Sequence, residues 1–257
     1  MLQEIDTPEI YLTDISYDTD NGIGSRANIG LLVLQTDQTI EEEFRQILPD
    51  GVALYNSRLK SPEEIAPAKL ALMEGEIPCA TGLLPAIPFS SIGFGCTSGA
   101  LVIGEDQVKR KVHEVLPEAS VTDPVTAAIA ALQALKAERV AVLTPYSPDI
   151  TLSLRSQFQQ RGLSIPVLGT FNQPDDYVVA KITADAIMAA ILKLGRSDLI
   201  DAVFVSCTSL RVAEVIAKAE SQLNKPVTSS NHAMAWHMLR LAGIDDVMPQ
   251  HGKLFEV

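Results

Sequence analysis

Basic charge and long apolar runs are scarce in this chain of 257 residues. Lysine and arginine number 20 against 32 acidic residues, which gives a net charge of −12. Nucleic acids and anionic membrane surfaces are bound through basic patches, so this balance argues against both as partners. No stretch reaches the roughly 18 to 20 uninterrupted apolar residues that a membrane-spanning helix needs. We therefore expect no membrane association.

Cysteine is also rare, with three residues in the chain. The N-terminal segment MLQEIDTPEIYLTD is acidic and lacks the basic flank and apolar core of a signal peptide. Together these features predict a cytoplasmic protein, in which cysteines act as thiols rather than as disulfide bonds. The apolar fraction of 47% is sufficient for a globular protein with a sizeable core.

The motifs of common cofactors are missing. The segment GIGSRANIG contains Gly22 and Gly24 but no third glycine at the dinucleotide-binding spacing, and it precedes a strand instead of following one. No phosphate-loop motif is present. The four histidines lack metal-ligand spacing, and His232 and His237 would lie on different faces of a helix. The sequence predicts neither a cofactor nor a metal site.

A regular alternation of short apolar runs and helical patterns begins at residue 28. The predicted strands are NIGLLVLQ, GVALYN, SSIGFGC, RVAVLTP, IPVLGTF and AVFVSC. The predicted helices are QTIEEEFRQIL, PEEIAPAKLALMEGEI, VTAAIAALQALKA, DITLSLRSQFQQRG, DAIMAAILKL, SLRVAEVIAKAESQL and NHAMAWHMLRLAGI. This alternation predicts an α/β fold with parallel sheets flanked by helices.

Three landmarks recur at an offset of 111 residues. The paired positions are 29–32 with 140–143, Gly51 with Gly162, and Cys96 with Cys207. The repeat predicts two similar halves related by a pseudo-twofold axis, with the active site in the cleft between them. The expected domain bounds are an N-terminal extension over 1–26, a first half over 27–135 joined by 230–257, and a second half over 136–229.

Cys96 and Cys207 each end an apolar strand and are each followed by Thr-Ser. Ligands of open parallel sheets bind at this end of the strands. Where a helix follows, its unpaired N–H groups and its dipole can lower a thiol pKa from ~8.5 toward roughly 3.5 to 7.5. The same N–H groups, together with nearby hydroxyls, form a cradle for a carboxylate. The predicted hydroxyls are those of Thr97, Ser98, Thr208 and Ser209.

Two thiols on opposite faces of one carbon can invert its configuration, because one removes a proton and the other returns one. Alternatively, one thiolate attacks as a nucleophile while the other thiol delivers a proton. A cysteine at the end of an apolar strand can instead be a core residue. The matched Thr-Ser turns favour catalysis for Cys96 and Cys207, and the core alternative is preferred for Cys79 in EIPCATG.

The segments GCTSG and SCTSLR, set in two α/β halves, resemble the aspartate/glutamate racemase superfamily over about residues 27–245. They are most similar to the branch that contains maleate cis-trans isomerase and arylmalonate decarboxylase. The resemblance implies that Tyr146 in VLTPY contacts a substrate carboxylate and that Asn172 in GTFNQPDD binds substrate. Arylmalonate decarboxylase keeps only the second cysteine, so the presence of both favours isomerisation or racemisation.

One position departs from that branch. Maleate isomerases tend to read Ser-Ser-Asn-Thr-Thr after the first strand, whereas LQTDQT places Asp37 where their asparagine helps to hold the substrate. A carboxylate about 4 Å from a substrate carboxylate costs on the order of a few kcal/mol, while the same Asp would favour an ammonium group. Alternatively, Asp37 caps the helix that follows. The substrate therefore stays open between a maleate-like dicarboxylate and an amino or hydroxy acid.

The sequence thus predicts a cofactor-independent isomerase or racemase of a small carboxylic acid. Two alternatives remain: a malonate-type decarboxylase with Cys207 as proton donor, and a non-catalytic protein that binds small acids. Arg58 and Arg211 are left out of the predicted site, Arg211 because it is expected along a helix surface. His232 is expected at the surface, at the start of the last helix. The apolar face of that helix leaves a homo-oligomer open.

Overall fold

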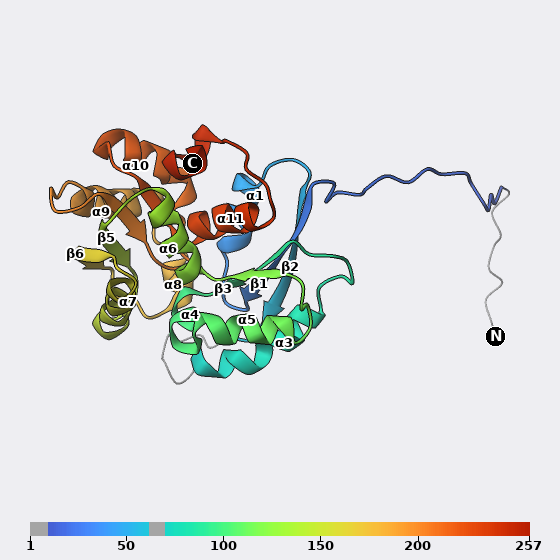
Figure 1. Ribbon diagram of the computed structural model, residues 1–257, viewed down its shortest axis with the longest axis horizontal. Coiled ribbons are helices and arrows are strands. Elements are labelled where there is room, and N and C mark those ends of the chain that lie inside the picture. Colours follow the sequence, from blue (N-terminus) through green and yellow to red (C-terminus); the bar gives the residue numbers. More distant parts are fainter. Residues whose placement is uncertain (1–9, 62–69) are drawn as a thin grey trace.

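The computed structural model describes residues 10–61 and 70–257 and contains two parallel four-stranded sheets (Figure 1). The first sheet has the order β2-β1-β3-β4, and the second has the order β6-β5-β7-β8. The strands of the first sheet are β1 (Ala27–Leu34), β2 (Val52–Leu59), β3 (Ser91–Gly95) and β4 (Ser120–Thr122). Those of the second are β5 (Arg139–Thr144), β6 (Ser164–Thr170), β7 (Ala202–Val205) and β8 (Val227–Ser229). The identical order confirms the prediction of two similar halves.

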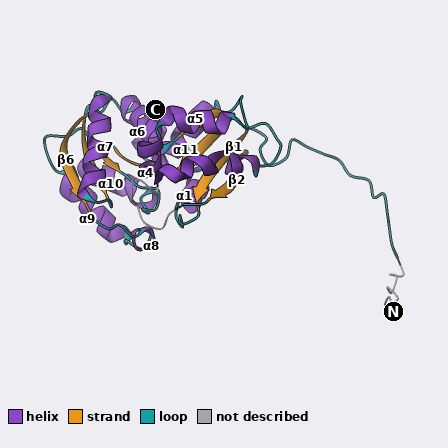
Figure 2. Ribbon diagram, turned by 90° about the horizontal axis from the view of Figure 1, so that it is seen from below, coloured by secondary structure: helices purple, strands orange, loops and turns teal. Residues whose placement is uncertain are grey.

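Helices flank both sheets, and the strands lie among them in both views (Figures 1 and 2). The α-helices are α1 (Ile40–Ile47), α3 (Ile77–Gly82), α4 (Thr97–Ile103), α5 (Glu105–His113), α6 (Pro124–Ala134), α7 (Pro148–Gln160), α8 (Asp176–Val179), α9 (Ala184–Gly195), α10 (Ile216–Leu223) and α11 (Ser230–Leu241). The 3₁₀ helices are η1 (Ala71–Glu76), η2 (Ala213–Val215), η3 (Pro249–His251) and η4 (Lys253–Glu256). None of the helices in the described ranges is long and apolar enough to cross a bilayer.

The landmarks of the sequence repeat occupy equivalent places in the two halves. β1 and β5 are the second strands in their sheets, and both are almost fully buried. Gly51 (φ +81°) and Gly162 (φ +88°) both adopt the left-handed backbone that leads into the edge strands β2 and β6. Residues that carry a side chain rarely adopt this backbone conformation, which explains why glycine occupies each position. Cys96 and Cys207 follow β3 and β7.

Helix α11 carries the end of the chain across to the first sheet. It follows β8 of the second sheet, yet it packs against α1, α6 and β3. Its buried residues Ala233, Met234 and Met238 share an apolar cluster with Ile29 and Leu31 of β1. The Ser229 hydroxyl begins the helix by accepting a hydrogen bond from the His232 N–H at 3.2 Å. The start of α11 therefore lies between the two halves.

Some elements differ from the sequence predictions. The three-residue strands β4 and β8 were not predicted, because they are too short to show a periodic pattern. The helix predicted over 62–77 lies partly outside the described residues. Its described end forms η1 and α3, where Gly75 and Pro78 interrupt a continuous α-helix. The helix predicted to begin at Ser209 begins only at Ile216, after η2.

Residues 10–24 are largely exposed and run away from the body of the protein (Figure 1).

We expect Gly95→Ala to destabilise the protein by roughly 1 to 3 kcal/mol, because the core must shift to admit a methyl group. A Cβ at Gly95 would lie 2.9 Å from the Leu32 carbonyl oxygen and 3.1 Å from Ile40 Cδ1. Urea unfolding measures the change. Gly75→Ala is the matched control, because a Cβ there meets no described atom within 4 Å. Equal stability of the two variants would contradict the close approach of β3 and β1.

Candidate active site

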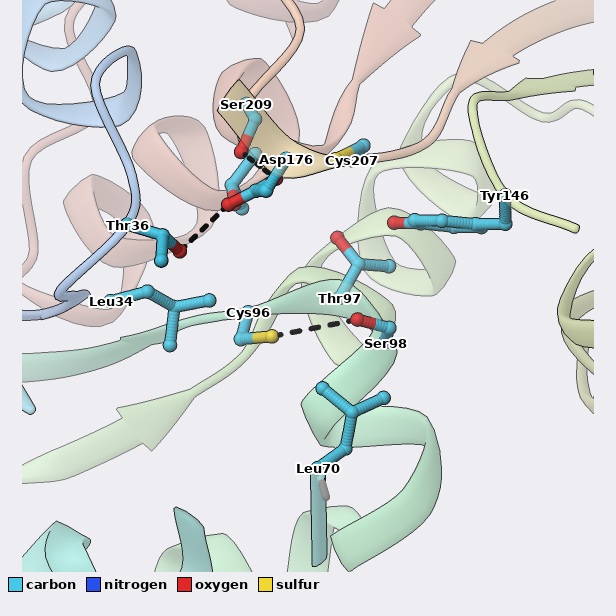
Figure 3. Close-up of a pocket in the computed structure, with 11 residues that line it drawn as sticks. Leu34, Thr36, Leu70, Cys96, Thr97, Ser98, Tyr146, Asp176, Cys207 and Ser209 are labelled. Atoms are coloured by element: carbon cyan, nitrogen blue, oxygen red, sulfur yellow. Dashed lines mark hydrogen bonds between the residues drawn. The ribbon is translucent and has the colours of Figure 1, made fainter. Parts of the chain in front are cut away.

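One small pocket lies where the central strands of the two sheets end (Figure 3). Leu34 ends β1, and Cys96 follows β3. Tyr146 and Cys207 follow β5 and β7. The other residues that line the pocket are Thr36, Leu70, Thr97, Ser98, Asp176, Thr208 and Ser209. Both cysteines, Tyr146 and the hydroxyls of both Thr-Ser turns, all predicted from the sequence, thus meet at one place.

Cys96 is the N-cap residue of α4, with an extended backbone (φ −149°, ψ 113°). Its Sγ accepts a hydrogen bond from the Gly99 N–H at 3.1 Å and lies 3.7 Å from the Ser98 hydroxyl oxygen. A Cβ at position 99 would lie 2.9 Å from that sulfur, so glycine allows the first turn to approach it. The helix terminus therefore fixes the position of the sulfur.

The protonation of Cys96 differs from the sequence prediction. Burial raises the pKa of its thiol to about 12 and outweighs the hydrogen bonds from Gly99 and Ser98, which lower the pKa. The negative charges of Asp176 and Asp37 raise the pKa further. The predicted lowering of the thiol pKa is wrong here, because desolvation of the thiolate exceeds the stabilisation that the helix terminus provides.

Cys207 lies in a turn that differs from its counterpart. Its backbone has φ +116°, a conformation that costs energy for a residue with a side chain. The next α-helix in the chain begins only at Ile216, so Cys207, unlike Cys96, is not the N-cap residue of a helix. Burial raises the pKa of this thiol, and the charge of Asp176 raises it further. The matched sequences thus form two different local structures.

Ser230, the first residue of α11, joins the two turns. Its hydroxyl accepts a hydrogen bond from the Cys207 N–H at 3.0 Å and shares another, at 2.9 Å, with the hydroxyl of Thr97. The Thr208 hydroxyl adds a long contact of 3.5 Å to the Gly95 carbonyl oxygen. Sequence reasoning missed Ser230, because only the path of α11 brings it to the site.

Tyr146 reaches the pocket from the end of β5 and is almost fully buried. Burial raises the pKa of its phenol well above the usual value, and the negative charge of a thiolate at Cys207 would act in the same direction. The Ser206 hydroxyl donates a hydrogen bond to the phenol oxygen at 3.4 Å. The phenol therefore keeps its proton and can donate it in a hydrogen bond to an anion.

Asp176, at the start of α8, is a pocket residue that sequence reasoning missed. Its carboxylate accepts hydrogen bonds from the Thr36 hydroxyl at 2.8 Å and from the Ser209 hydroxyl at 2.7 Å (Figure 3). The Ser209 hydroxyl is thus engaged with a carboxylate of the protein. The segment PDD before a short helix was visible in the sequence, but nothing in it indicated which Asp faces inward.

Asp37 is buried and binds the backbone at the start of α1, but Thr39 rather than Asp37 is the N-cap residue of that helix. Its Oδ1 accepts hydrogen bonds from the Thr39 N–H at 2.7 Å and from the Ile40 N–H at 2.9 Å. Burial raises the pKa of its carboxyl to about 6, which exceeds the lowering by these bonds. Asp37 is not among the residues that line the pocket.

Asn172 also lies outside the pocket. It is exposed, has a left-handed backbone (φ +52°), and donates its N–H to the Thr170 hydroxyl at 2.9 Å. The turn after β6 thus directs position 172 to the surface, and Asp176 further along enters the pocket instead. The guanidinium groups of Arg58 and Arg211 bind Glu41 and the Ile182 carbonyl oxygen, respectively, and neither lines the pocket.

Glu43 of α1 ties the second cysteine turn to the first half. Its carboxylate accepts hydrogen bonds from the N–H groups of Val212 and Ala213 at 2.5 and 2.6 Å, and from the Asn231 side chain at 2.8 Å. Asn231 also donates to the Thr208 carbonyl oxygen at 2.8 Å. These bonds hold the chain after Cys207 open, which explains why the helix begins late. Burial raises the pKa of Glu43 to about 7.

Two further expectations are corrected. His232 is buried rather than at the surface, and its ring binds the Thr228 hydroxyl at 3.0 Å and the His251 carbonyl oxygen at 2.8 Å. Burial lowers the pKa of this imidazole to about 4, so it stays neutral. Cys79 is exposed on α3 rather than part of the core. Within residues 10–61 and 70–257, no three His, Cys, Asp or Glu side chains are grouped to hold a metal ion.

The pocket has two chemically different ends with the thiols between them (Figure 3). Tyr146, Thr97 and Ser98 form an end rich in hydroxyl donors, and Asp176 forms an end that accepts hydrogen bonds. Cys96 and Cys207 come from opposite halves and lie on opposite sides of the gap. Such an arrangement can hold a small acid by its carboxylate and present a sulfur to each side of its reacting carbon.

Comparison with known proteins identifies one matching family and several relatives. A family model described as arylmalonate decarboxylase matches residues 104–255, more than half of the chain. A maleate isomerase of Pseudomonas putida is 22% identical over 241 residues, covering 88% of this chain and 96% of that protein.

Solved structures share the fold. One is a maleate cis-trans isomerase variant of Nocardia farcinica with a covalently bound succinylcysteine intermediate. It has a TM-score of 0.82 and 23% identity, covering 90% of this chain and 98% of that one. A liganded variant of arylmalonate decarboxylase has a TM-score of 0.77 and 20% identity, covering 90% and 99% of the two chains.

We expect the three thiols to differ in their reaction with iodoacetamide. The exposed Cys79 should be alkylated first at pH 8. Cys96 and Cys207 should react slowly, at rates that still rise above pH 10, because burial raises both pKa values. Peptide mass spectrometry at a series of pH values measures each rate. Cys79→Ser should remove only the fast phase, and rapid alkylation of Cys96 at pH 7 would contradict the assigned protonation.

Glu43 should make the protein less stable as the pH rises from about 4.5 to 7. Its folded-state pKa of about 7 lies above the ordinary 4.5, so its proton favours the folded state, and this stabilisation is lost as the proton leaves. The loss is on the order of 3 kcal/mol, because each unit of pKa difference corresponds to about 1.4 kcal/mol. Urea unfolding at pH 5 and pH 8 measures it.

Glu43→Gln should weaken this pH dependence, because the amide oxygen can still accept the two backbone hydrogen bonds but does not titrate. Glu42→Gln is the control, since Glu42 is exposed on the same helix. An unchanged slope in Glu43→Gln would show that other groups produce the pH dependence.

Proposed function

Because this chain belongs to the arylmalonate decarboxylase family, we propose that it is a cofactor-independent isomerase or racemase of a small carboxylic acid. Cys96 and Cys207 are the proposed reacting pair. The observation that carries the proposal is their position, at equivalent strand ends of the two halves and on opposite sides of one buried pocket. Relatives that this chain matches over nearly their full length are maleate isomerases.

The donor end of the pocket is proposed to hold the substrate carboxylate. The Tyr146 phenol stays protonated, and the hydroxyls of Thr97 and Ser98 lie beside the N-terminus of α4. Charge-assisted hydrogen bonds to a carboxylate are stronger than those between neutral groups. Thr208 and Ser209 complete the wall near Cys207. Asp37 and Glu43 are assigned to positioning, and Asn172 is left out because it faces solvent.

For an unsaturated acid, the proposed reaction is cis-trans isomerisation. The Cys96 thiolate forms a C–S bond to one alkene carbon, and the π electrons move to the other carbon and its attached carbonyl group. The Cys207 thiol protonates that second carbon, which leaves a single bond free to rotate. Cys207 then takes the proton back, and the C–S bond breaks to give the trans alkene and the original thiolate. No atom or electron is gained or lost.

For a saturated acid with a chiral α-carbon, the same pair would act in racemisation. One thiolate removes the α-proton and the opposite thiol supplies a proton to the other face. Both schemes need one thiol ionised and one protonated, although burial favours the protonated form of each. They also need two reduced thiols, and we propose the cytoplasm as the location of the protein.

The second candidate is decarboxylation of a disubstituted malonate, with Cys207 protonating the enediolate left by carbon dioxide. The description of the matching family favours it. That reaction requires only one thiol, so the fate of activity without Cys96 separates the two candidates. A non-catalytic acid-binding protein would show ligand binding without turnover by either thiol.

Cys96→Ala and Cys207→Ala should each reduce turnover at least 10³-fold, because each removes one partner of the pair. The measurement is proton NMR in deuterium oxide with maleate, aspartate, glutamate, 2-hydroxy acids and phenylmalonate. Isomerisation replaces the alkene proton signal of maleate with that of its trans isomer, and racemisation brings deuterium into the α-position of a chiral acid.

Cys79→Ala is the control and should keep full activity, because Cys79 lies on the surface of α3. If Cys96→Ala keeps full activity and carbon dioxide is released from the malonate, the proposed isomerase is wrong and the protein is a decarboxylase. In a racemase, one single variant can still exchange the α-proton of one enantiomer, which distinguishes racemisation from isomerisation.

A further inference from the structure

At the acceptor end of the pocket, the hydrogen-bond partners of the Asp176 carboxylate within residues 10–61 and 70–257 are neutral hydroxyl groups. Asp176 is 6% exposed, and both of its oxygens accept hydrogen bonds from hydroxyl groups, those of Thr36 and Ser209. Among residues 10–61 and 70–257, no lysine, arginine or histidine lines this pocket. Burying a charge beside hydroxyls alone is costly unless a ligand completes its contacts.

A second buried carboxylate, that of Asp37, interacts electrostatically with the first. Asp37 is 2% exposed, and its Oδ2 has no hydrogen-bond partner within the described ranges. The charges of Asp37 and Asp176 repel each other, which contributes to the raised pKa of Asp37. This side of the pocket therefore attracts hydrogen-bond donors and cations and repels anions.

A dicarboxylate fits these charges poorly. If one substrate carboxylate binds Tyr146, Thr97 and Ser98, the small pocket directs the other end of the molecule toward Asp176. A second carboxylate there would face a carboxylate at close range in a desolvated site, which is strongly unfavourable. An amide N–H or an ammonium group in the same place would donate to the Asp176 oxygens.

We propose that the pocket selects a small monocarboxylic acid whose second polar group donates hydrogen bonds, and that Asp176 is the residue that discriminates against dicarboxylates. The substrate class is an acid with a carboxamide or ammonium group about two carbons from its carboxylate. This inference rests on the proposed function for the reaction, but the selection itself is a property of binding.

The same contact helps to explain how the buried thiols become reactive. The charge of Asp176 raises the pKa of both Cys96 and Cys207. A donor or cation bound to Asp176 offsets that charge, so binding of the selected substrate lowers the cost of forming a thiolate. A dicarboxylate would act in the opposite direction. Recognition and activation would thus depend on one carboxylate.

The test uses three saturated acids that cannot isomerise: succinamate, β-alanine and succinate. They carry a carboxamide, an ammonium and a carboxylate, respectively, each separated from a shared carboxylate by two methylene groups. Isothermal titration calorimetry on the full chain at pH 7.5 should show at least tenfold tighter binding of succinamate or β-alanine than of succinate. Tighter binding of succinamate would indicate that the site prefers a neutral donor, and tighter binding of β-alanine would indicate a cationic one.

Asp176→Asn should reduce or reverse this preference by at least tenfold, because the amide NH2 can donate to the succinate carboxylate. The amide oxygen still accepts from one of the two hydroxyls, and the other hydroxyl can turn to accept from the NH2 group. Asp175→Asn is the matched control: it removes the same charge one residue away, is exposed, and keeps its capping role, since Asn caps as well as Asp. The control should retain the preference of the native protein.

The three acids are compared first on the unmodified protein. The proposal can therefore be tested even if Asp176→Asn folds poorly. Succinate binding as tightly as the other two acids would overturn it, and so would binding of none of the three below about 10 mM. A preference that persists in a folded Asp176→Asn protein would remove Asp176 from its role. If the preference holds but no unsaturated or chiral acid with the preferred donor group is turned over, the catalytic proposal fails while the selection stands.

Discussion

The Ser230 hydroxyl between the two cysteine turns is the contact on which the architecture of the site depends. It binds the Cys207 N–H from one half and the Thr97 hydroxyl from the other, so it fixes how far apart the two strand ends lie. Ser230 reaches this place because α11 leaves the second sheet and packs on the first. The relative position of the two cysteine turns, which come from different halves, is thereby determined by the first residue of one helix.

Close contact between the halves has an electrostatic consequence. It removes water from Cys96, Cys207 and Tyr146, and desolvation is the largest cause of the raised pKa at each. The carboxyl groups of Asp37 and Glu43 are desolvated in the same way. A buried acidic group destabilises a fold unless its hydrogen bonds compensate for the lost contact with water. The hydrogen bonds of Glu43 also hold the turn after Cys207.

Much of the fold follows from local sequence patterns. The buried strands around the repeated landmarks are short apolar runs, and Gly51 and Gly162 mark turns that require a left-handed backbone. The prediction failed where tertiary contacts compete with local preference. After Cys207, helical periodicity begins at once, but hydrogen bonds from Val212 and Ala213 to Glu43 keep the backbone out of a helix. Such a partner, 169 residues away in the chain, is invisible to a local pattern.

The sequence by itself determined the two-halved α/β fold and the cysteine pair, because periodicity and a repeated motif are local properties of the chain. Only the tertiary structure decided the charges around that pair. It turned Asn172 outward, brought Asp176 into the pocket and raised the thiol pKa values that a helix terminus alone would lower. Burial and the distances between charges control these properties, and both arise only when distant segments pack together.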